Sequence, residues 1–135
     1  MAGDLGVCLL NDSFPPLIDG VANAVVNYAN IIQHTLGRAL VATPHYPDAE
    51  DRYDFPVVRY RSLNTTKLVG YRAGYPFSAR SLAAVEAFGP DLLHSHCPIM
   101  SNMMARTLRE KLDVPMVFTY HTKFDIDIAH ALELK

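Results

Sequence analysis

The stretch that decides the fold is LGVCLL at residues 5–10, followed by NDSFPPLIDG at residues 11–20. The first six residues are continuously apolar, which is typical of a β-strand covered on both faces. The next ten are rich in Pro, Asp and Gly and predict a loop. Apolar residues then recur at helical spacing up to Gly37, so the loop leads into an amphipathic helix. The expected buried face of this helix consists of Val21, Ala24, Val25, Tyr28, Ile32 and Leu36.

The same alternation of strand and helix continues along the chain. Four further strands are expected at residues 38–43, 56–61, 91–95 and 115–120. Helices are expected from Ser78 to Gly89, over Met100–Leu112 and from about Ile126. This order predicts an α/β fold with a doubly wound parallel sheet of about five strands, in the order 3-2-1-4-5, and helices on both faces. Ligands of such sheets bind at the carboxyl edge, where the winding reverses.

Composition and charge narrow the class of protein. With 135 residues the chain is long enough for one domain, and its net charge of −2 excludes a generally basic nucleic-acid coat. The only two cysteines are Cys8 and Cys97, which excludes a disulfide framework and indicates a reducing compartment. The N-terminus lacks the basic start of a signal peptide, and the longest uncharged run, residues 20–37, contains Asn, Gln and His. A cytoplasmic protein is expected.

Gly20 stands immediately before the first predicted helix. A glycine there lets a ligand approach the backbone, and the helix N-terminus offers free N–H groups to a phosphate. The same residues also fit an ordinary helix start with Asp19 as N-cap. The GxGxxG fingerprint of dinucleotide-binding proteins is absent.

Three histidines lie at or just past the ends of the fourth and fifth predicted strands. His94 and His96 share one face by the two-residue period of a strand, and His121 lies at the end of the next strand. With Cys97 they suggest a metal site, but their spacing matches no common zinc pattern, so no metal is expected. Recognition of a hydroxylated ligand is the second interpretation. A structural role is favoured for His94, which is inside its strand, and a functional one for His121.

Residues 55–85 contain no acidic side chain. Basic residues interleaved with aromatic ones are what an anionic membrane surface attracts. The alternative is a solvated loop whose charges pair with the acidic remainder of the chain. Nucleic acid fits less well, because no recognition motif accompanies the basic residues. The residues concerned are Arg59, Arg61, Lys67, Arg72 and Arg80, with Tyr60, Tyr71, Tyr75 and Phe77 among them.

Three motifs resemble segments of the family-4 glycosyltransferases, in the order found in that family. They are NDSFPPLIDGVANAVVNYANII (residues 11–32), PDLLHSHCP (90–98) and VPMVFTYHTKFD (114–125). YHT followed by an aromatic residue and Asp most resembles the bacterial branch that glucosylates diacylglycerol. The resemblance implies a Rossmann-like N-terminal domain of a GT-B enzyme, which faces a donor-binding domain across a cleft.

The resemblance also implies a reaction and roles for single residues. The reaction is retaining transfer of a sugar from a nucleoside diphosphate sugar, here UDP-glucose, to a diacylglycerol-like lipid, with no metal or cofactor. Gly20 would lie against the donor diphosphate, and His121 would hydrogen-bond the transferred sugar near the reacting carbon. Asp19, which stands where many members have Asn, and His96 would lie at the acceptor-side rim. The residues expected to face the inner surface of the cell membrane are Arg59, Arg61, Lys67 and Arg72.

The chain departs from the family in lacking the Glu-x7-Glu pair of the donor domain. Residues 1–135 are therefore expected to form a truncated, acceptor-side domain that does not catalyse transfer alone, because both sides of the cleft position the reactants. The alternative function is that of a non-catalytic α/β binding module, which recognises an anionic or sugar ligand or a partner chain.

Overall fold

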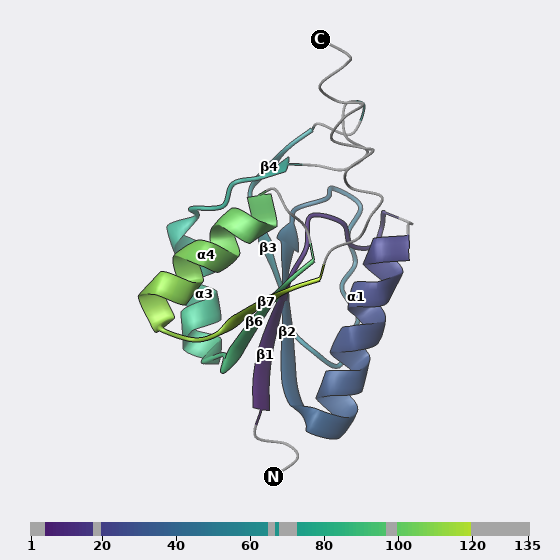
Figure 1. The fold of residues 1–135 in the computed structure, drawn as a ribbon. Helices are drawn as coiled ribbons and strands as arrows, with labels where there is room; N and C mark the ends of the chain where they lie inside the picture. The colour runs from purple at the N-terminus through teal and green to yellow at the C-terminus, as the bar shows by residue number, and fades with distance from the viewer. Residues whose placement is uncertain (1–4, 18–19, 65–66, 68–72, 97–99, 120–135) are drawn as a thin grey trace.

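A five-stranded parallel sheet forms the centre of the described part of the chain. The computed structural model describes residues 5–17, 20–64, 67, 73–96 and 100–119. The strands are β1 (Leu5–Leu10), β2 (Gly37–Pro44), β3 (Val57–Tyr60), β6 (Leu92–Ser95) and β7 (Met116–Phe118). They pair in parallel in the order β3-β2-β1-β6-β7 (Figure 1). When only the five strands of this sheet are numbered along the chain, the order is 3-2-1-4-5, as predicted. The doubly wound, Rossmann-like fold is therefore confirmed.

Helices cover both faces of the sheet. Helix α1 (Gly20–Ile31) packs on one face, and α3 (Ala79–Phe88) and α4 (Met100–Leu112) pack on the other (Figure 1). Alternate residues of β1 enter the two cores: Val7 and Leu9 lie on the α1 side, and Cys8 and Leu10 on the α3–α4 side. None of these four side chains is more than 2% exposed, as expected of a continuously apolar central strand.

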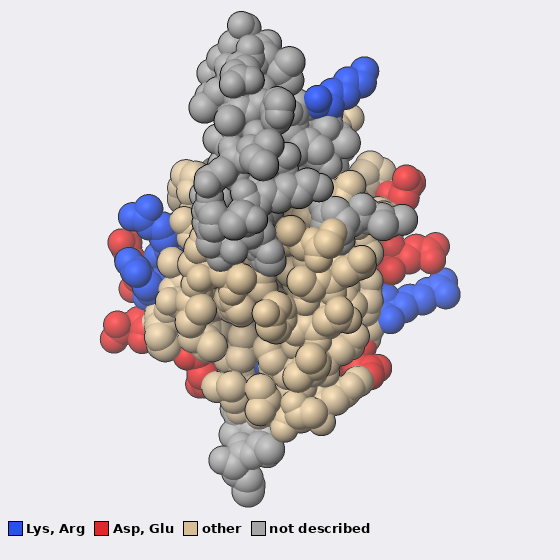
Figure 2. All heavy atoms as spheres, turned by 45° about the vertical axis from the view of Figure 1, so that its right-hand side comes forward, with Lys and Arg blue, Asp and Glu red and all other residues tan. Residues whose placement is uncertain are grey.

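The buried face of α1 differs from the predicted one. Tyr28 and Leu36, both expected to be buried, are 43% and 47% exposed. The residues that face the sheet are Ala22, Val25, Ala29 and Ile32. Alanine is only weakly hydrophobic. A buried helix face that consists partly of alanines is therefore difficult to recognise from hydrophobic periodicity when larger apolar residues lie on the other faces. None of the residues of α1 is charged, and in Figure 2 the charged side chains lie mainly at the margins of this face.

Gly37 ends the helical segment as predicted, after a π-helical stretch, η1 (Ile32–Leu36), that extends α1. It is also the first residue of β2, so helix and strand meet with no loop between them. A Cβ atom at Gly37 would lie 2.0 Å from the backbone oxygen of Leu5. The close approach of β1 therefore requires glycine at this position.

A short antiparallel hairpin separates β3 from α3 and was not predicted. Its strands are β4 (Ser62–Leu63) and β5 (Ala73–Gly74). The N–H of Tyr75 donates to the backbone oxygen of Arg61 at 2.7 Å, which returns the chain to the end of β3. Helix α3 then begins at the predicted N-cap: Ser78 Oγ accepts a hydrogen bond from the N–H of Ser81. The helix expected from about residue 126 lies outside the described residues.

Candidate functional site at the carboxyl edge of the sheet

The loops that follow β1 and β6 begin side by side. The N–H of His96, just after β6, donates to the backbone oxygen of Leu10, the last residue of β1, at 2.9 Å. On the other side of β6, the N–H of Thr119 donates to Ser95 at 3.0 Å. The predicted edge therefore brings together the starts of all three loops in which the sequence concentrates unusual residues.

Three aromatic rings contact one another at this edge, in tilted or edge-on arrangements. The imidazoles of His94 and His96 lie 4.0 Å apart between centroids, and the ring of Tyr28 in α1 lies 5.7 Å and 5.3 Å from them. A ring nitrogen of His94 is hydrogen-bonded at 2.5 Å to Oγ1 of Thr119, the residue that follows β7, which gives His94 a structural role. His96 is 0% exposed, so its ring lies beneath the rim and not on its surface.

A buried hydrogen-bonded network, which the sequence did not predict, holds the loop after β1. Asp12 Oδ1 accepts hydrogen bonds from the N–H of Ser101 at 3.1 Å and from its hydroxyl at 2.6 Å. The hydroxyl of Tyr60 lies 2.8 Å from Ser101 Oγ and is the donor there, because Ser101 gives its only hydroxyl proton to Asp12. All three side chains are at most 1% exposed. Since Ser101 lies in the first turn of α4, the carboxylate also faces the positive end of the helix dipole.

Gly20 is exposed at the first position of α1. A Cβ atom built there meets nothing within 4 Å, and the φ angle of Gly20 is not in the left-handed region. Neither packing nor backbone conformation in the described residues requires a glycine at this position, in contrast to Gly37. Asp19 and His121 lie outside the described residues.

The basic segment divides into inward and outward side chains. Arg59 was expected to face a membrane, but its side chain is only 9% exposed and forms two hydrogen bonds with Asp51, at 2.9 and 2.8 Å. It also donates to two backbone oxygens, at 2.9 and 2.6 Å, so it joins the loops around β3. The alternative reading, pairing with an acid elsewhere in the chain, is the right one for this arginine. Arg61 and Lys67 are exposed, and Arg72 lies outside the described residues.

The part of the chain that the structure describes contains no metal site, reactive thiol or membrane-spanning helix. There, no three His, Cys, Asp or Glu side chains lie close enough together to hold a metal ion; Cys97 and His121 are outside it. Full burial raises the pKa of the Cys8 thiol, which keeps it protonated and unreactive. Among the described helices, none has both the length and the apolar character needed to cross a bilayer.

Comparison with known proteins identifies the family. Residues 19–134 match the glycosyl transferase 4-like domain, so the chain belongs to this family, as its motifs indicated. A GDP-mannose-dependent alpha-mannosyltransferase of Mycobacterium tuberculosis is 31% identical over 121 residues, 86% of this chain and 32% of the relative. No solved structure matches significantly.

Two further relatives are also transferases or synthases of sugar-containing compounds. Sulfoquinovosyl transferase SQD2 of Arabidopsis thaliana is 24% identical over 82% of this chain and 22% of its own length. Alpha-monoglucosyldiacylglycerol synthase of Streptococcus pneumoniae is 20% identical over 90% of this chain and 27% of its own length. The chain thus spans about a third or less of the length of the curated relatives it matches.

Proposed function

We propose that the chain forms the acceptor side of a retaining glycosyltransferase that moves a hexose from a nucleoside diphosphate sugar to a lipid hydroxyl. In this reaction the acceptor hydroxyl oxygen bonds to the anomeric carbon as the bond from that carbon to the diphosphate oxygen breaks. The nucleoside diphosphate leaves, and the hydroxyl proton passes to the departing diphosphate. The observation that carries the proposal is the unoccupied space over Gly20, at the switch point of a domain whose family is known.

Gly20 is proposed to admit the diphosphate of the donor. The first N–H groups of α1 have no acceptor within the helix, and the helix dipole places partial positive charge there. A side chain at Gly20 would occupy the space in which a phosphate oxygen approaches those groups. Because nothing else in the described residues requires glycine, the substitution Gly20→Ala separates ligand binding from folding.

Two further roles follow from the motifs. His121 is proposed to hydrogen-bond the transferred sugar near the anomeric carbon and to stabilise the positive charge that develops there, without abstracting a proton. His96 is proposed to support the acceptor-side rim, together with Asp19. The tilted ring contacts of His96 with His94 and Tyr28 are consistent with a supporting role beneath the acceptor.

The acceptor is proposed to be a diacylglycerol-like lipid at an anionic membrane surface on the cytoplasmic side. One relative is named for the synthesis of a glucosyldiacylglycerol. Near the end of β3, exposed basic side chains occur with the exposed apolar side chains of Leu63, Tyr75 and Phe77, as at membrane interfaces. The residues proposed to face the membrane are Arg61, Lys67 and Arg72.

The test is transfer of labelled sugar to diacylglycerol in anionic vesicles, from UDP-glucose and, because of the mycobacterial relative, from GDP-mannose. The 135-residue chain is compared with the same chain extended through any downstream domain. Turnover is expected only in the extended form, because the transition state is stabilised from both sides of the cleft. Gly20→Ala in the extended form should reduce kcat/KM at least tenfold with an unchanged melting temperature. No transfer from either donor, or full activity of Gly20→Ala, would contradict the proposal.

A further inference from the structure

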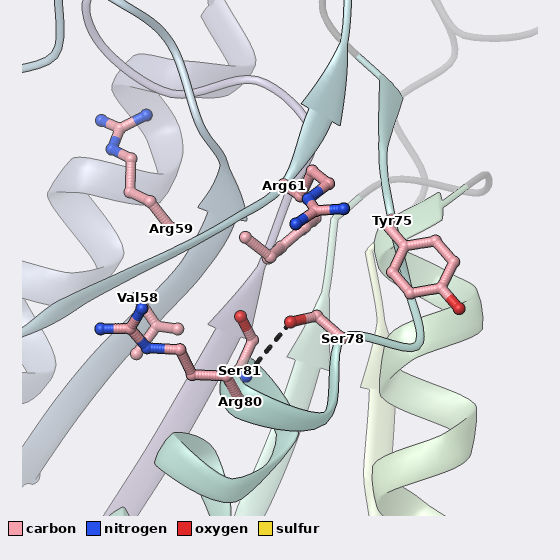
Figure 3. A pocket seen from close by; sticks show the side chains of 8 residues that line it. Val58, Arg59, Arg61, Tyr75, Ser78, Arg80 and Ser81 are labelled. Atoms are coloured by element: carbon pink, nitrogen blue, oxygen red, sulfur yellow. Dashed lines mark hydrogen bonds between the residues drawn. The ribbon is translucent and has the colours of Figure 1, made fainter.

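The buried side chain of Arg59 faces the loop that follows β1. Arg59 is one of the residues around the pocket drawn in Figure 3, but its side chain points away from those of Arg61 and Tyr75. Its guanidinium carbon lies instead 5.5 Å from the ring centroid of Phe14 and 6.0 Å from that of Tyr46. Because Phe14 belongs to the core on the α1 side of the sheet, Arg59 reaches toward the candidate site and not toward the pocket.

Four of the five N–H groups of this guanidinium are engaged within the described residues. Two of them bond the two carboxylate oxygens of Asp51, at 2.9 and 2.8 Å. The other two bond backbone oxygens, that of Pro44 at the end of β2 at 2.9 Å and that of Pro15 in the loop after β1 at 2.6 Å. With these bonds made and its side chain 9% exposed, Arg59 is suited to hold segments of the protein and not a ligand.

The loop after β1 depends on hydrogen-bond donors from outside, because it contains two consecutive prolines, which have no N–H group. The backbone oxygens of residues 12–15 all accept hydrogen bonds. Two of the donors are side chains of other segments: Tyr46 donates to the oxygen of Asp12 at 3.1 Å, and Arg59 donates to that of Pro15. Since the guanidinium also lies over the ring of Tyr46, Arg59 supports both attachments.

This loop leads to Gly20, which is proposed to admit the donor diphosphate. On its other side the loop is fixed to α4 by the two hydrogen bonds from Ser101 to the carboxylate of Asp12. The bond from Arg59 to Pro15 is the attachment on the β3 side, and it lies closer to Gly20 in the sequence. The approach of the chain to the start of α1 is therefore limited from two sides.

We propose that Arg59, oriented by Asp51, is a positioning residue for glycosyl transfer. It fixes the loop that places Gly20 and the first N–H groups of α1 against the donor diphosphate, and it does not touch the substrate itself. The identity of the ligand rests on the proposed function, whereas the attachment of the loop does not. Loss of Arg59 should therefore weaken the use of the donor and leave the use of the acceptor unchanged.

The substitution Arg59→Met tests the attachment, because it removes the four hydrogen bonds but keeps an unbranched apolar side chain. The matched control is Arg38→Met. Arg38 also donates to two backbone oxygens, those of Phe88 and Gly89, and lies 4.6 Å from the ring centroid of Phe88. It stands at the first turn of β2, at the opposite end of the sheet from the candidate site.

Amide hydrogen exchange in the 135-residue chain, followed by NMR, measures the order of the loop. The reporter is the N–H of Leu17, which donates to the oxygen of Phe14 at 3.0 Å. Its exchange is expected to be at least fivefold faster in Arg59→Met and changed less than twofold in Arg38→Met. The N–H of Leu93, which lies within the sheet, corrects for any change in overall stability. Unchanged exchange at Leu17, or equal acceleration in both variants, would overturn the attachment.

Kinetics of the chain extended through any downstream domain test the role in transfer. Arg59→Met should raise KM for the nucleoside diphosphate sugar at least fivefold and change KM for the acceptor less than twofold, whereas Arg38→Met should leave both unchanged. A merely structural role would lower the folded fraction, and hence the apparent kcat, without changing KM. An unchanged donor KM, or an equal rise of both KM values, would overturn the positioning role.

Two further variants keep the proposal testable where Arg59→Met does not fold. Arg59→Lys retains the charge but loses the planar fork, so a donor KM between those of the unaltered protein and Arg59→Met is expected. Asp51→Asn should raise the donor KM at least twofold, and should add nothing when combined with Arg59→Met, because the two residues act through the same attachment. Full additivity would contradict this. Absence of transfer by the unaltered extended protein would overturn the proposed function, and the exchange of Leu17 would then decide the attachment of the loop by itself.

Discussion

Replacing Ser101 with alanine removes the hydroxyl that joins Asp12 to Tyr60. The deleted group donates to a fully buried carboxylate at 2.6 Å and accepts from a tyrosine at 2.8 Å. A hydrogen bond to a charged group contributes about 1.5–3 kcal/mol and a neutral one about 1 kcal/mol, whereas alanine has a slightly better helix propensity than serine. We therefore expect Ser101→Ala to lower the free energy of unfolding by about 2–4 kcal/mol.

Urea unfolding measures this loss, and Thr107→Ala is the matched control. Thr107 also lies on α4 and its hydroxyl also makes one bond, but to a backbone oxygen in an exposed environment. Its replacement should change stability by less than about 0.5 kcal/mol. A double-mutant cycle with Tyr60→Phe should show coupling of at least about 0.5 kcal/mol between Tyr60 and Ser101. Equal effects of the two alanine substitutions, or strict additivity in the cycle, would refute the network.

Two other perturbations test the interior. Gly37→Ala should destabilise the chain by at least about 3 kcal/mol, because its Cβ atom would lie 2.0 Å from the backbone oxygen of Leu5; stability equal to that of the unaltered chain in urea would contradict the packing of β1 on β2. Burial raises the pKa of the Cys8 thiol in the folded state, so only the unfolded chain loses this proton near its ordinary pKa of about 8.5. The stabilisation of the folded state by the protonated thiol is complete below that pH. Above it, the free energy of unfolding should fall by about 1.4 kcal/mol per pH unit. Cys8→Ala should remove this part of the slope, and an identical slope in both proteins would show that the thiol is not buried.

The strands and their order were predictable, because their signals are local. Continuous apolar runs such as residues 5–10 identify buried strands, and alternation with helices allows few topologies. The caps of α3 were predictable for the same reason: Ser78 and Gly89 act on their immediate neighbours. The β4–β5 hairpin was not, because two-residue strands are too short to show any periodicity.

The interactions around the candidate site were less predictable, because they join distant residues. Asp12 and Ser101 are 89 positions apart, and only the fold brings α4 to the loop after β1. The available signal in the sequence was that Asn11 and Asp12 directly follow an apolar strand. This signal indicates a polar site but does not identify Ser101 as the partner of Asp12. Arg59 was misplaced because the acid-free composition of its segment hides the pairing with Asp51, which lies just outside that segment.

The central position of β1 has a consequence for how the chain matures during synthesis. Its first neighbour, β2, follows within about 30 residues, but its second, β6, pairs Leu10 with Ser95. A nascent chain therefore carries β1 as an apolar edge, with unpaired backbone groups on one side, until some ninety residues have left the ribosome. The central strand of the finished sheet thus spends most of the chain's synthesis as an edge strand, and the high contact order of the β1–β6 pair makes its closure slow.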